Sequence, residues 1–406
     1  MKRVLIFSIT YHPFIGGAEV AIKEITDRIP GAHFDMITLR LSSKVPYFEK
    51  IGNVNVYRIG FVKRGELNNL KVKFPLTLNK KLFPFFALFH AYRLNKKHPY
   101  DMIWGMMASY AGFAALFWKI LHPETPYLLS LQEGDPIERI KKKVKWIHPF
   151  FAQIFRKADK IQAISNFLKN FALEFSPQKD VVVIPNGVDV ERFETTFDPS
   201  AIENIRNEIG KHHMESGKVI NSQNVALITV SRLVHKNGID TLIKAMKFLP
   251  NTMRLAIVGE GPQLMELKEL ADDIDEDRIM FLGNKDHSVV PLYLKACDIF
   301  IRPSRSEGFG NSFVEAMAAG VPVVASNVGG ITDFLVDPIF VGKEKATGLF
   351  CDHDDPKSVA IAVMKYVDDI QLRQVIIQNA KKMVKERYDW KNIAKDMEKL
   401  FNQMMK

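Results

Sequence analysis

The residues whose types and spacing best suit chemistry lie in the segment 304–330, which reads SRSEGFGNSFVEAMAAGVPVVASNVGG. A predicted strand ends just before it, two glycines turn the chain, and a helical pattern follows. Because Gly308 and Gly310 lack side chains, the N–H groups around Phe309, Gly310 and Asn311 can approach a ligand closely. The partially positive N-terminus of the following helix points to the same place. We therefore expect an anionic or hydroxyl-rich ligand at this turn.

Two carboxylates flank this turn. Glu307 lies in the loop, and Glu315 follows it after seven intervening residues. Both can accept hydrogen bonds from sugar or ribose hydroxyls. An alternative stays open, because Ser312 and Glu315 also have the spacing of a capping box, which would satisfy helix N–H groups without any ligand. The glycine turn and the preceding Glu307 favour ligand binding.

Two cations follow the first predicted strand of the second half, in VSRLVHKNG at 230–238. Arg232 and Lys236 lie four residues apart just beyond the strand end. Both can therefore reach one pyrophosphate and neutralise charge as a leaving group departs. A pair of ordinary surface cations is the alternative. Gly238, before the next helical pattern, predicts a tight turn.

The elements that must position these residues alternate along the chain. Short β-branched runs alternate with helical periodicity, which is typical of βαβ units and parallel sheets. We predict strands at 2–8, 34–39, 54–60, 101–106, 126–131, 160–164, 181–184, 225–230, 253–258, 279–282, 298–302 and 321–326. We predict amphipathic helices at 18–29, 239–248, 263–271, 357–368 and 391–405.

A chain of 406 residues is too long for a single ordinary hydrophobic core, so we expect two domains. The predicted fold class is α/β, with two Rossmann-like domains whose parallel sheets face each other across a cleft, where strand ends bind ligands. We expect an N-terminal domain at 1–190 and a C-terminal domain at 191–385. The helix at about 386–406 is expected to pack back on the N-terminal domain. The polar, charged segment 193–222 is interpreted as the connection.

The net charge of +10 is concentrated in the first half of the chain. Residues 62–98 carry nine Lys or Arg against one Glu, and residues 136–160 carry eight against two acids. The first stretch also contains several phenylalanines, a combination that suits an anionic membrane surface. A solvated charged face over a buried helix is the alternative. Nucleic acid is not expected, since no recognised module accompanies the charge.

The segment 304–330 resembles the family-4 retaining glycosyltransferases with the GT-B fold, and the resemblance covers most of the chain. It implies that Glu307 contacts the donor sugar and that Glu315 contacts the ribose. The backbone of residues 309–311 would meet sugar and phosphate oxygens. The resemblance also implies that the domain at 1–190 binds the acceptor and the domain at 191–385 binds the nucleotide sugar. The acceptor half of such proteins varies most, so the resemblance does not specify the acceptor.

Other segments carry the resemblance further. Arg232 and Lys236 resemble the family's diphosphate-binding pair, and PNGVDVERF at 185–193 resembles a strand-end motif of the family. GEGP at 259–262 resembles a turn that borders the nucleotide, and it lacks the third glycine of an NAD-binding fingerprint. Residues 281–284 would lie beside the nucleobase. The donor-binding residues implied by the resemblance are Gly16, Gly17, Gly259, Gly283, Gly308, Phe309, Gly310, Asn311 and Glu315.

The chain departs from the family at Gln132, where many relatives carry a histidine near the reacting carbon. Glutamine can bind a hydroxyl but cannot transfer a proton at pH 7. In front-face retaining transfer the leaving phosphate oxygen accepts the acceptor's proton, so Gln132 need only position substrate. Alternatively, Glu133 or Asp135 assists, or the chain binds its ligand without catalysis.

The sequence thus predicts a retaining hexosyltransferase that uses a UDP- or GDP-sugar and a lipid-linked, glycan or polysaccharide acceptor. The expected catalytic residues are Arg232, Lys236, Glu307 and Gln132. Acidic runs at 272–277 and 352–355 are interpreted as solvated faces, so no metal or other cofactor is expected. With only two cysteines in apolar surroundings, we expect a cytoplasmic chain that can bind the inner face of the cell membrane. The alternatives are a catalytically silent nucleotide-sugar-binding protein and a sugar-nucleotide epimerase on the same fold.

Overall fold

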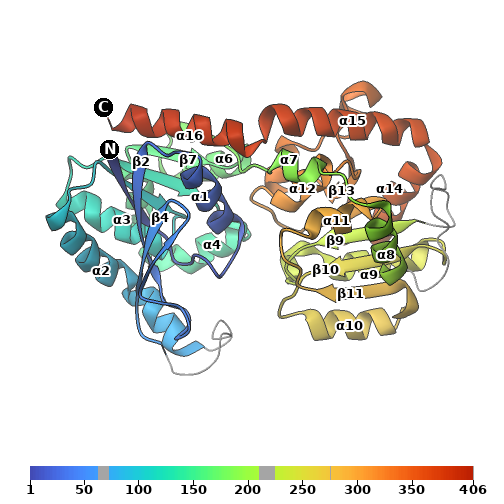
Figure 1. Cartoon of the computed structure of the whole chain (residues 1–406), viewed down its shortest axis with the longest axis horizontal. Coiled ribbons are helices and arrows are strands. Elements are labelled where there is room, and N and C mark those ends of the chain that lie inside the picture. The colour runs from blue at the N-terminus through green and yellow to red at the C-terminus, as the bar shows by residue number, and fades with distance from the viewer. Residues whose placement is uncertain (63–72, 210–224, 275, 406) are drawn as a thin grey trace. The chain divides into compact units, whose positions relative to one another are not determined.

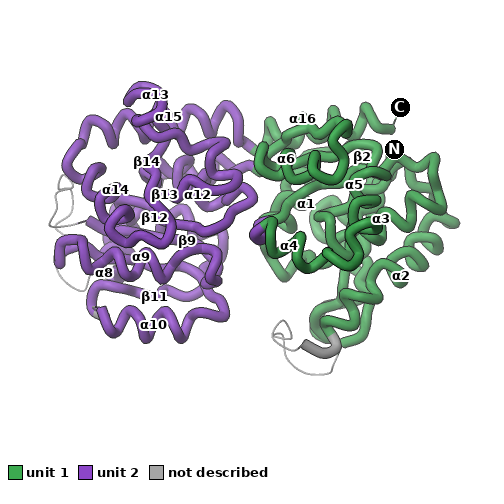
Figure 2. The backbone as a smooth tube through the Cα atoms, turned by 180° about the vertical axis from the view of Figure 1, so that it is seen from behind, with its two compact units in different colours: residues 1–133, 137–186, 390–406 green, residues 134–136, 187–389 purple. Residues whose placement is uncertain are grey.

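The structure is a computed structural model that describes residues 1–62, 73–209, 225–274 and 276–405 (Figure 1). The chain forms two compact units, coloured separately in Figure 2. Unit 1 comprises Met1–Glu133, Ile137–Asn186 and Trp390–Lys406, and unit 2 comprises Gly134–Pro136 and Gly187–Asp389. Apart from the short segment Gly134–Pro136, the chain therefore enters unit 2 after Asn186 and returns to unit 1 after Asp389.

Unit 1 contains an eight-stranded sheet of order β3-β4-β2-β1-β5-β6-β7-β8. Its strands are β1 (Lys2–Phe7), β2 (Ala32–Leu39), β3 (Phe48–Ile51), β4 (Val54–Ile59), β5 (Met102–Met106), β6 (Tyr127–Leu131), β7 (Lys160–Ala163) and β8 (Val181–Val183). All neighbours pair in parallel except β3, which is antiparallel to β4. The predicted parallel sheet is confirmed, and the unpredicted edge strand β3 adds one antiparallel pair to it.

The helices of unit 1 bury the sheet. They are α1 (Gly17–Asp27), α2 (Lys73–Lys97), α3 (Tyr110–Leu121), α4 (Ile137–Val144), α5 (His148–Lys157), α6 (Asn166–Phe175) and α16 (Trp390–Met404). Four consecutive residues of β1, at 4–7, are fully buried, which requires cover on both faces of the strand. Helices α1 and α16 pack together, while α3 contacts both α2 and α5 (Figure 2).

The C-terminal helix α16 belongs to unit 1 because of its apolar stripe. Its buried residues recur at helical spacing, at Trp390, Ile393, Ala394, Met397, Leu400 and Phe401. The ring of Phe401 lies 6.2 Å from that of Phe34 and 5.2 Å from that of Trp104. The end of the chain thereby packs on its first strands (Figure 2).

Unit 2 contains a six-stranded parallel sheet of order β11-β10-β9-β12-β13-β14. Its strands are β9 (Ala226–Val230), β10 (Arg254–Val258), β11 (Ile279–Gly283), β12 (Ile299–Arg302), β13 (Val323–Ser326) and β14 (Leu349–Cys351). Its helices are α7 (Val190–Glu194), α8 (Pro199–Ile209), α9 (Ile239–Ala245), α10 (Leu264–Asp272), α11 (Val290–Lys295), α12 (Asn311–Ala318), α13 (Pro338–Val341), α14 (Pro356–Asp368) and α15 (Ile370–Arg387).

The segment 193–222, interpreted as the connection and the entry to the second half, lies inside unit 2 in its described part, so it is an entry to that unit and not a linker. Helix α8 packs on α11 within unit 2. The guanidinium of Arg206 donates hydrogen bonds of 3.0 Å to the carboxylate of Asp298 and to the backbone oxygen of Ala296. Residues 210–222 lie outside the described part of the chain.

Each of the twelve predicted strands has a counterpart whose ends differ by at most two residues. Strands β3 and β14 were not predicted. Among the described residues, no helix is both long and apolar enough to cross a membrane.

Candidate active site

Apart from Gly16 and Gly17 in unit 1, the predicted donor-binding residues lie in and beside loops at the carboxyl ends of the strands of unit 2. These loops follow β9, β10, β11 and β12. Because the sheet is parallel, the loops emerge at one edge, which is where open α/β sheets bind ligands.

The loop after β10 packs directly on the loop that carries Arg232. Gly259 has φ +136°, and a Cβ there would lie 1.9 Å from the backbone oxygen of Ser231. A Cβ on Gly261 would lie 2.2 Å from the backbone oxygen of Leu233. The two glycines therefore let the backbone of the β10 loop pack directly against the backbone of the β9 loop and support it. At the end of β11, a Cβ on Gly283 would meet no heavy atom within 4 Å.

The glycine turn after β12 opens α12 as expected. Gly310 is the N-cap with φ +96°, and a Cβ there would lie 2.5 Å from the ring of Phe313. The N-cap supplies no side-chain hydrogen bond, so the first amides of α12, beginning at Asn311, form a partially positive end. Phe309 is 1% exposed, which leaves its backbone as the part that can meet a ligand.

The capping-box alternative for Ser312 and Glu315 is wrong. The Oγ of Ser312 accepts a hydrogen bond of 2.7 Å from Arg302 instead. Gly310 is the N-cap, so Ser312 is the second residue of α12 and Glu315 the fifth. Glycine adopts a left-handed backbone easily, so α12 begins directly after Gly310. A capping box would instead require Ser312 to be the N-cap, two residues later.

Glu307 is held in place by its neighbours. One carboxylate oxygen accepts a 2.6 Å hydrogen bond from Arg302 Nη2, and the other accepts one of 3.1 Å from the N–H of Gly308. A Cβ on Gly329 would lie 2.0 Å from the backbone oxygen of Glu307, so the turn after β13 closes tightly behind it. The carboxylate is thus oriented before any ligand arrives.

Arg302 is the organising residue that sequence reasoning missed. It is 5% exposed at the end of β12, and its guanidinium lies 4.1 Å from the ring centroid of Phe313. Burial lowers the pKa of Arg302, while the carboxylates of Glu307 and Glu315 raise it. An arginine in the otherwise apolar strand sequence IFIR was the available signal, since a buried charge requires partners.

Glu315 is 7% exposed, and its Oε1 lies 2.8 Å from Nε2 of His287. The backbone oxygen of His287 in turn accepts a hydrogen bond from Arg192 of α7. His287 was also missed, because nothing around it in the sequence indicates a carboxylate partner. Glu315 is therefore oriented from the loop after β11 as well as from α12.

Lys236 and Glu307 meet in unit 2. The Nζ of Lys236 donates a 2.6 Å hydrogen bond to the backbone oxygen of Gly134, which belongs to the same unit. A Cβ on Gly134 would lie 2.7 Å from that Nζ, 3.7 Å from Glu307 Oε1 and 3.9 Å from the N–H nitrogen of Gly308. A cation, a carboxylate and an amide thus surround one point. Arg232 is exposed on the same loop as Lys236.

The β9 and β12 loops are tied together beside this point. Gly238 has φ +67°, and a Cβ there would lie 2.0 Å from the backbone oxygen of Pro303. Arg305 donates a 2.7 Å backbone hydrogen bond to Lys236 and forms two 2.8 Å side-chain bonds to Asp240. The position of Lys236 is therefore fixed by backbone packing and by an ion pair.

In unit 1, the two amide groups of Gln132 and Asn186 bond each other reciprocally at 2.9 Å. Glu133 accepts a 2.6 Å hydrogen bond from the N–H of Ala108, so it anchors the loop before α3. Gly16 is the N-cap of α1, and Gly17 is its first residue. These residues belong to the other unit from Lys236 and Glu307.

The acidic runs form no evident metal site. Among the residues that the structure describes, no group of three or more His, Cys, Asp or Glu side chains could hold a metal ion. In the second run, the carboxylate of Asp354 pairs with Arg305. Residue 275, in the first run, lies outside the described part.

Comparisons with known proteins match both halves of the chain. The family described as glycosyltransferase family 4 matches residues 15–192, and the family described as glycosyl transferases group 1 matches residues 213–383. An uncharacterised glycosyltransferase of Methanocaldococcus jannaschii is 26% identical over 422 aligned residues, with 99% of each chain covered. The GDP-mannose-dependent alpha-(1-6)-phosphatidylinositol monomannoside mannosyltransferase of Mycobacterium tuberculosis is 31% identical over 251 residues, covering 58% of this chain and 60% of that one.

Solved structures share the architecture. Sucrose-phosphate synthase from Thermosynechococcus elongatus superposes with a TM-score of 0.80 at 21% identity, with 99% of each chain covered. Anabaena HepE in complex with UDP-glucose superposes with a TM-score of 0.75 at 20% identity, covering 99% of this chain and 100% of that one. With two Rossmann-like units and both halves matched, the chain belongs to the family-4 glycosyltransferases and has their GT-B fold.

Proposed function

We propose that the chain is a retaining hexosyltransferase that moves a hexose from a UDP- or GDP-linked donor to a lipid-linked, glycan or polysaccharide acceptor. The observation that carries the proposal is the meeting of Lys236, Glu307 and the amide of Gly308 around one point beside the N-terminus of α12. A sugar nucleotide places a diphosphate next to several hydroxyls. A cation and helix amides suit the diphosphate, and an oriented carboxylate suits the hydroxyls.

Each residue has a role that follows from its position. Lys236 and Arg232 would hold the diphosphate, and the amides at the start of α12 would bind its oxygens. Glu307, oriented by Arg302, would accept hydrogen bonds from sugar hydroxyls. Glu315, oriented by His287, would accept hydrogen bonds from the ribose hydroxyls. Because Arg302 and His287 fix these carboxylates beforehand, little ordering is required when the donor binds.

Transfer by this site needs no side-chain base. The bond between the anomeric carbon and the leaving phosphate oxygen breaks as the acceptor oxygen attacks from the same face. The acceptor's proton passes to that phosphate oxygen, whose charge the cations stabilise. Gln132 would only position substrate, in keeping with its amide pair to Asn186. Electrostatic work by Lys236 and Arg232 replaces that of a divalent metal.

A donor panel tests the proposal. Purified protein is mixed with UDP-glucose, UDP-galactose, GDP-mannose and GDP-glucose, and nucleotide release is followed with and without EDTA. Release from one donor in EDTA, with an α-configured product by NMR, is the expected result. Complete loss of turnover in EDTA would refute the metal-free mechanism, and a β product would refute retention. Tight nucleotide binding without turnover of any donor or acceptor would instead support the silent binding protein.

We also propose that unit 1 binds an anionic membrane surface. Three apolar side chains near the start of α5 are largely exposed, with Trp146 at 92%, Ile147 at 43% and Phe150 at 68%. They follow the lysines of α4, and Lys143 of that helix lies close enough to Lys80 of α2 to lower its pKa, although burial lowers it more. Exposed aromatics beside cations suit a lipid headgroup region.

Vesicle co-sedimentation tests this surface. Wild-type protein should sediment with vesicles of anionic lipid at low salt and less at 0.5 M salt, as screening shortens the electrostatic range. Phe150→Ser should weaken sedimentation, whereas Phe340→Ser in unit 2, which is also 68% exposed, should not. Equal sedimentation of both variants would defeat the proposal.

A further inference from the structure

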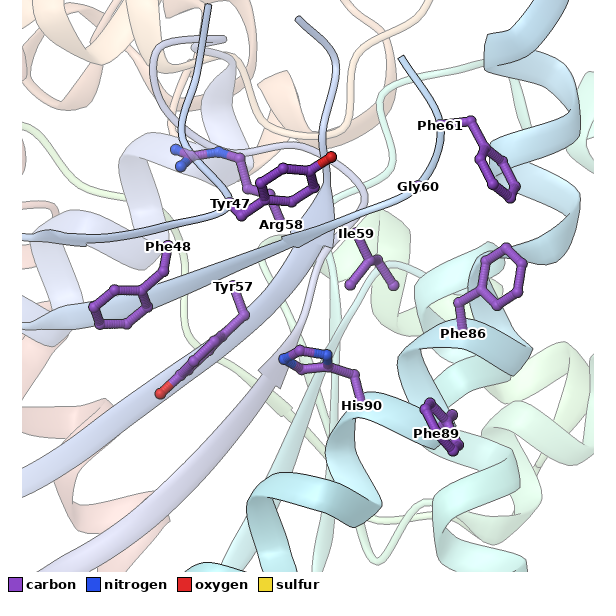
Figure 3. Close-up of a pocket in the computed structure, with 10 residues that line it drawn as sticks. All are labelled: Tyr47, Phe48, Tyr57, Arg58, Ile59, Gly60, Phe61, Phe86, Phe89 and His90. Atoms are coloured by element: carbon purple, nitrogen blue, oxygen red, sulfur yellow. The ribbon is translucent and has the colours of Figure 1, made fainter. Parts of the chain in front are cut away.

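A pocket of about 450 Å³ lies in unit 1 between the β3–β4 strand pair and helix α2. Its volume lies in the range of ligand pockets, roughly 300–1,000 Å³. Figure 3 shows side chains of the strand pair on one side, those of α2 on the other, and Ile59 between them. The lining residues are Tyr47, Phe48, Tyr57, Arg58, Ile59, Gly60, Phe61, Phe86, Phe89 and His90. One wall is thus made by the antiparallel edge strand.

The walls are mainly aromatic rings in contact with one another. The ring of Tyr57 lies 5.0 Å from that of Phe48 and 5.5 Å from that of His90. Across the opening, Phe61 meets Phe86 edge to face at 5.8 Å. The rings surround the space instead of presenting one flat platform (Figure 3).

The polar groups of the lining offer little to a polar ligand. Arg58 is 4% exposed, pairs with Glu49 at 2.5 Å and donates a 2.7 Å hydrogen bond to the backbone oxygen of His12. Burial, and then the charge of Arg93, lowers the pKa of His90, and burial raises that of Tyr57. Both side chains are therefore neutral at pH 7. A sugar would leave several hydroxyls without partners here.

Two further cations lie against the lining rings. The guanidinium of Arg93 lies 5.7 Å from the ring centroid of Phe89, and that of Arg40 lies 3.9 Å from the ring centroid of Tyr47. Arg93 is exposed, one helical turn after Phe89 on α2. An uncharged interior bordered by cations is complementary to an amphiphile with an anionic head.

We propose that this pocket takes the hydrocarbon chain of a phosphate-bearing lipid, with Arg93 at its phosphate. The inference rests on the proposed function in one respect, because it selects the lipid-linked class among the proposed acceptors. Binding to the pocket requires no turnover and no donor. Failure of transfer and failure of this inference are therefore distinguished by separate measurements.

Calorimetry with alkyl phosphates below their micelle concentrations tests the proposal on the full chain. If the alkyl chain is buried, each added methylene between hexyl and decyl phosphate should tighten binding by about fourfold. Phe89→Ser should weaken decyl phosphate binding at least tenfold. Its matched control is Phe340→Ser in unit 2, because the two rings are 63% and 68% exposed and only Phe89 lines the pocket.

The headgroup is tested with Arg93→Gln. This variant should bind decyl phosphate more weakly but decyl maltoside unchanged, while Lys97→Gln on the same helix should leave both unchanged. Affinity independent of chain length, or equal losses in Phe89→Ser and Phe340→Ser, would overturn the proposal. So would tight binding of free maltose, or a wild-type dimer in scattering measurements that Phe89→Ser dissociates, since a sugar or a second copy would then occupy the pocket.

Discussion

The guanidinium of Arg302 donates a 2.6 Å hydrogen bond to the carboxylate of Glu307, and the two side chains are only 7% and 13% exposed. The same guanidinium contacts Ser304 and Ser312, so one strand-end arginine joins the loop after β12 to the first turn of α12. The carboxylate that would meet the donor sugar is therefore fixed by a charge that the ligand never touches.

Replacing Arg302 with Met should lower the free energy of unfolding by about 3–5 kcal/mol, because a mostly buried carboxylate would lose its cation. Urea denaturation followed by circular dichroism measures the change. The stability of Arg302→Lys should lie between those of Arg302→Met and the wild type. An ammonium keeps the charge but cannot bridge Glu307 and Ser312 as the planar guanidinium does. Equal stability of Arg302→Met and the wild type would show that the pair is not a structural requirement.

Glu307→Gln should affect activity more than stability. The amide keeps a hydrogen-bond acceptor for Arg302, and Glu315 remains as a nearby carboxylate, so stability should fall less than in Arg302→Met. Hydrogen bonds from sugar hydroxyls to a charged acceptor contribute roughly 1.5–3 kcal/mol, so kcat/KM should fall about 10- to 150-fold. Glu344→Gln, at an exposed position of the same unit, is the control and should retain full activity. Unchanged kcat/KM in Glu307→Gln would remove Glu307 from the sugar site.

Lys236→Ala should weaken binding of UDP or GDP by about tenfold or more, because a charge-assisted contact to the diphosphate is lost. Binding of the free nucleoside should not change, since the lysine does not face the base. Calorimetric titrations with nucleotide and nucleoside separate the two effects. Lys247→Ala, another exposed cation of unit 2, should bind both ligands normally. A parallel loss of nucleoside affinity would indicate a distorted loop instead.

The sequence predicted the strands of this fold well where their burial is continuous. Strand β10 has the residues RLAIV and is buried after its first residue, so its apolar run is readable without context. Strand β3 was missed because its four residues, FEKI, are exposed or half-buried at the edge of the sheet. Strand β14 has only three residues, too few for a periodic pattern.

The candidate site was predictable in its local part only. The glycine turn at Gly310 and the flanking carboxylates follow from residue type and spacing. The partners of those carboxylates do not, because Arg302 reaches Glu307 from within a buried strand, and His287 reaches Glu315 from the loop after another strand. The residue at which α12 begins also depends on the glycine turn. The helix begins directly after Gly310, although Ser312 and Glu315 have the spacing of a capping box.

Asp240 predicts a specific acid dependence of stability. Burial raises its pKa, but the two hydrogen bonds from Arg305 outweigh burial, so the pKa lies below its usual value. A carboxyl with a depressed folded pKa contributes stability that is fully present above its unfolded pKa of about 3.9 and is lost as the pH falls through the folded pKa. Asp240→Asn should therefore be less stable than wild type at pH 7, and the difference should shrink below about pH 4. Unfolding free energies at pH 7, 4 and 3 measure this, and a constant difference would contradict it.

Gly259→Ala should destabilise unit 2 and impair nucleotide binding, because a Cβ at φ +136° would lie 1.9 Å from the backbone oxygen of Ser231. A left-handed backbone costs a non-glycine residue about 1–3 kcal/mol, and the β9 loop that carries Arg232 must also move away. Gly31→Ala is the matched control, since a Cβ there meets no heavy atom within 4 Å. It should leave nucleotide affinity unchanged and stability equal or slightly higher, because alanine restricts the unfolded chain. Normal nucleotide affinity in Gly259→Ala would mean that the β10 loop does not support the diphosphate-binding cations.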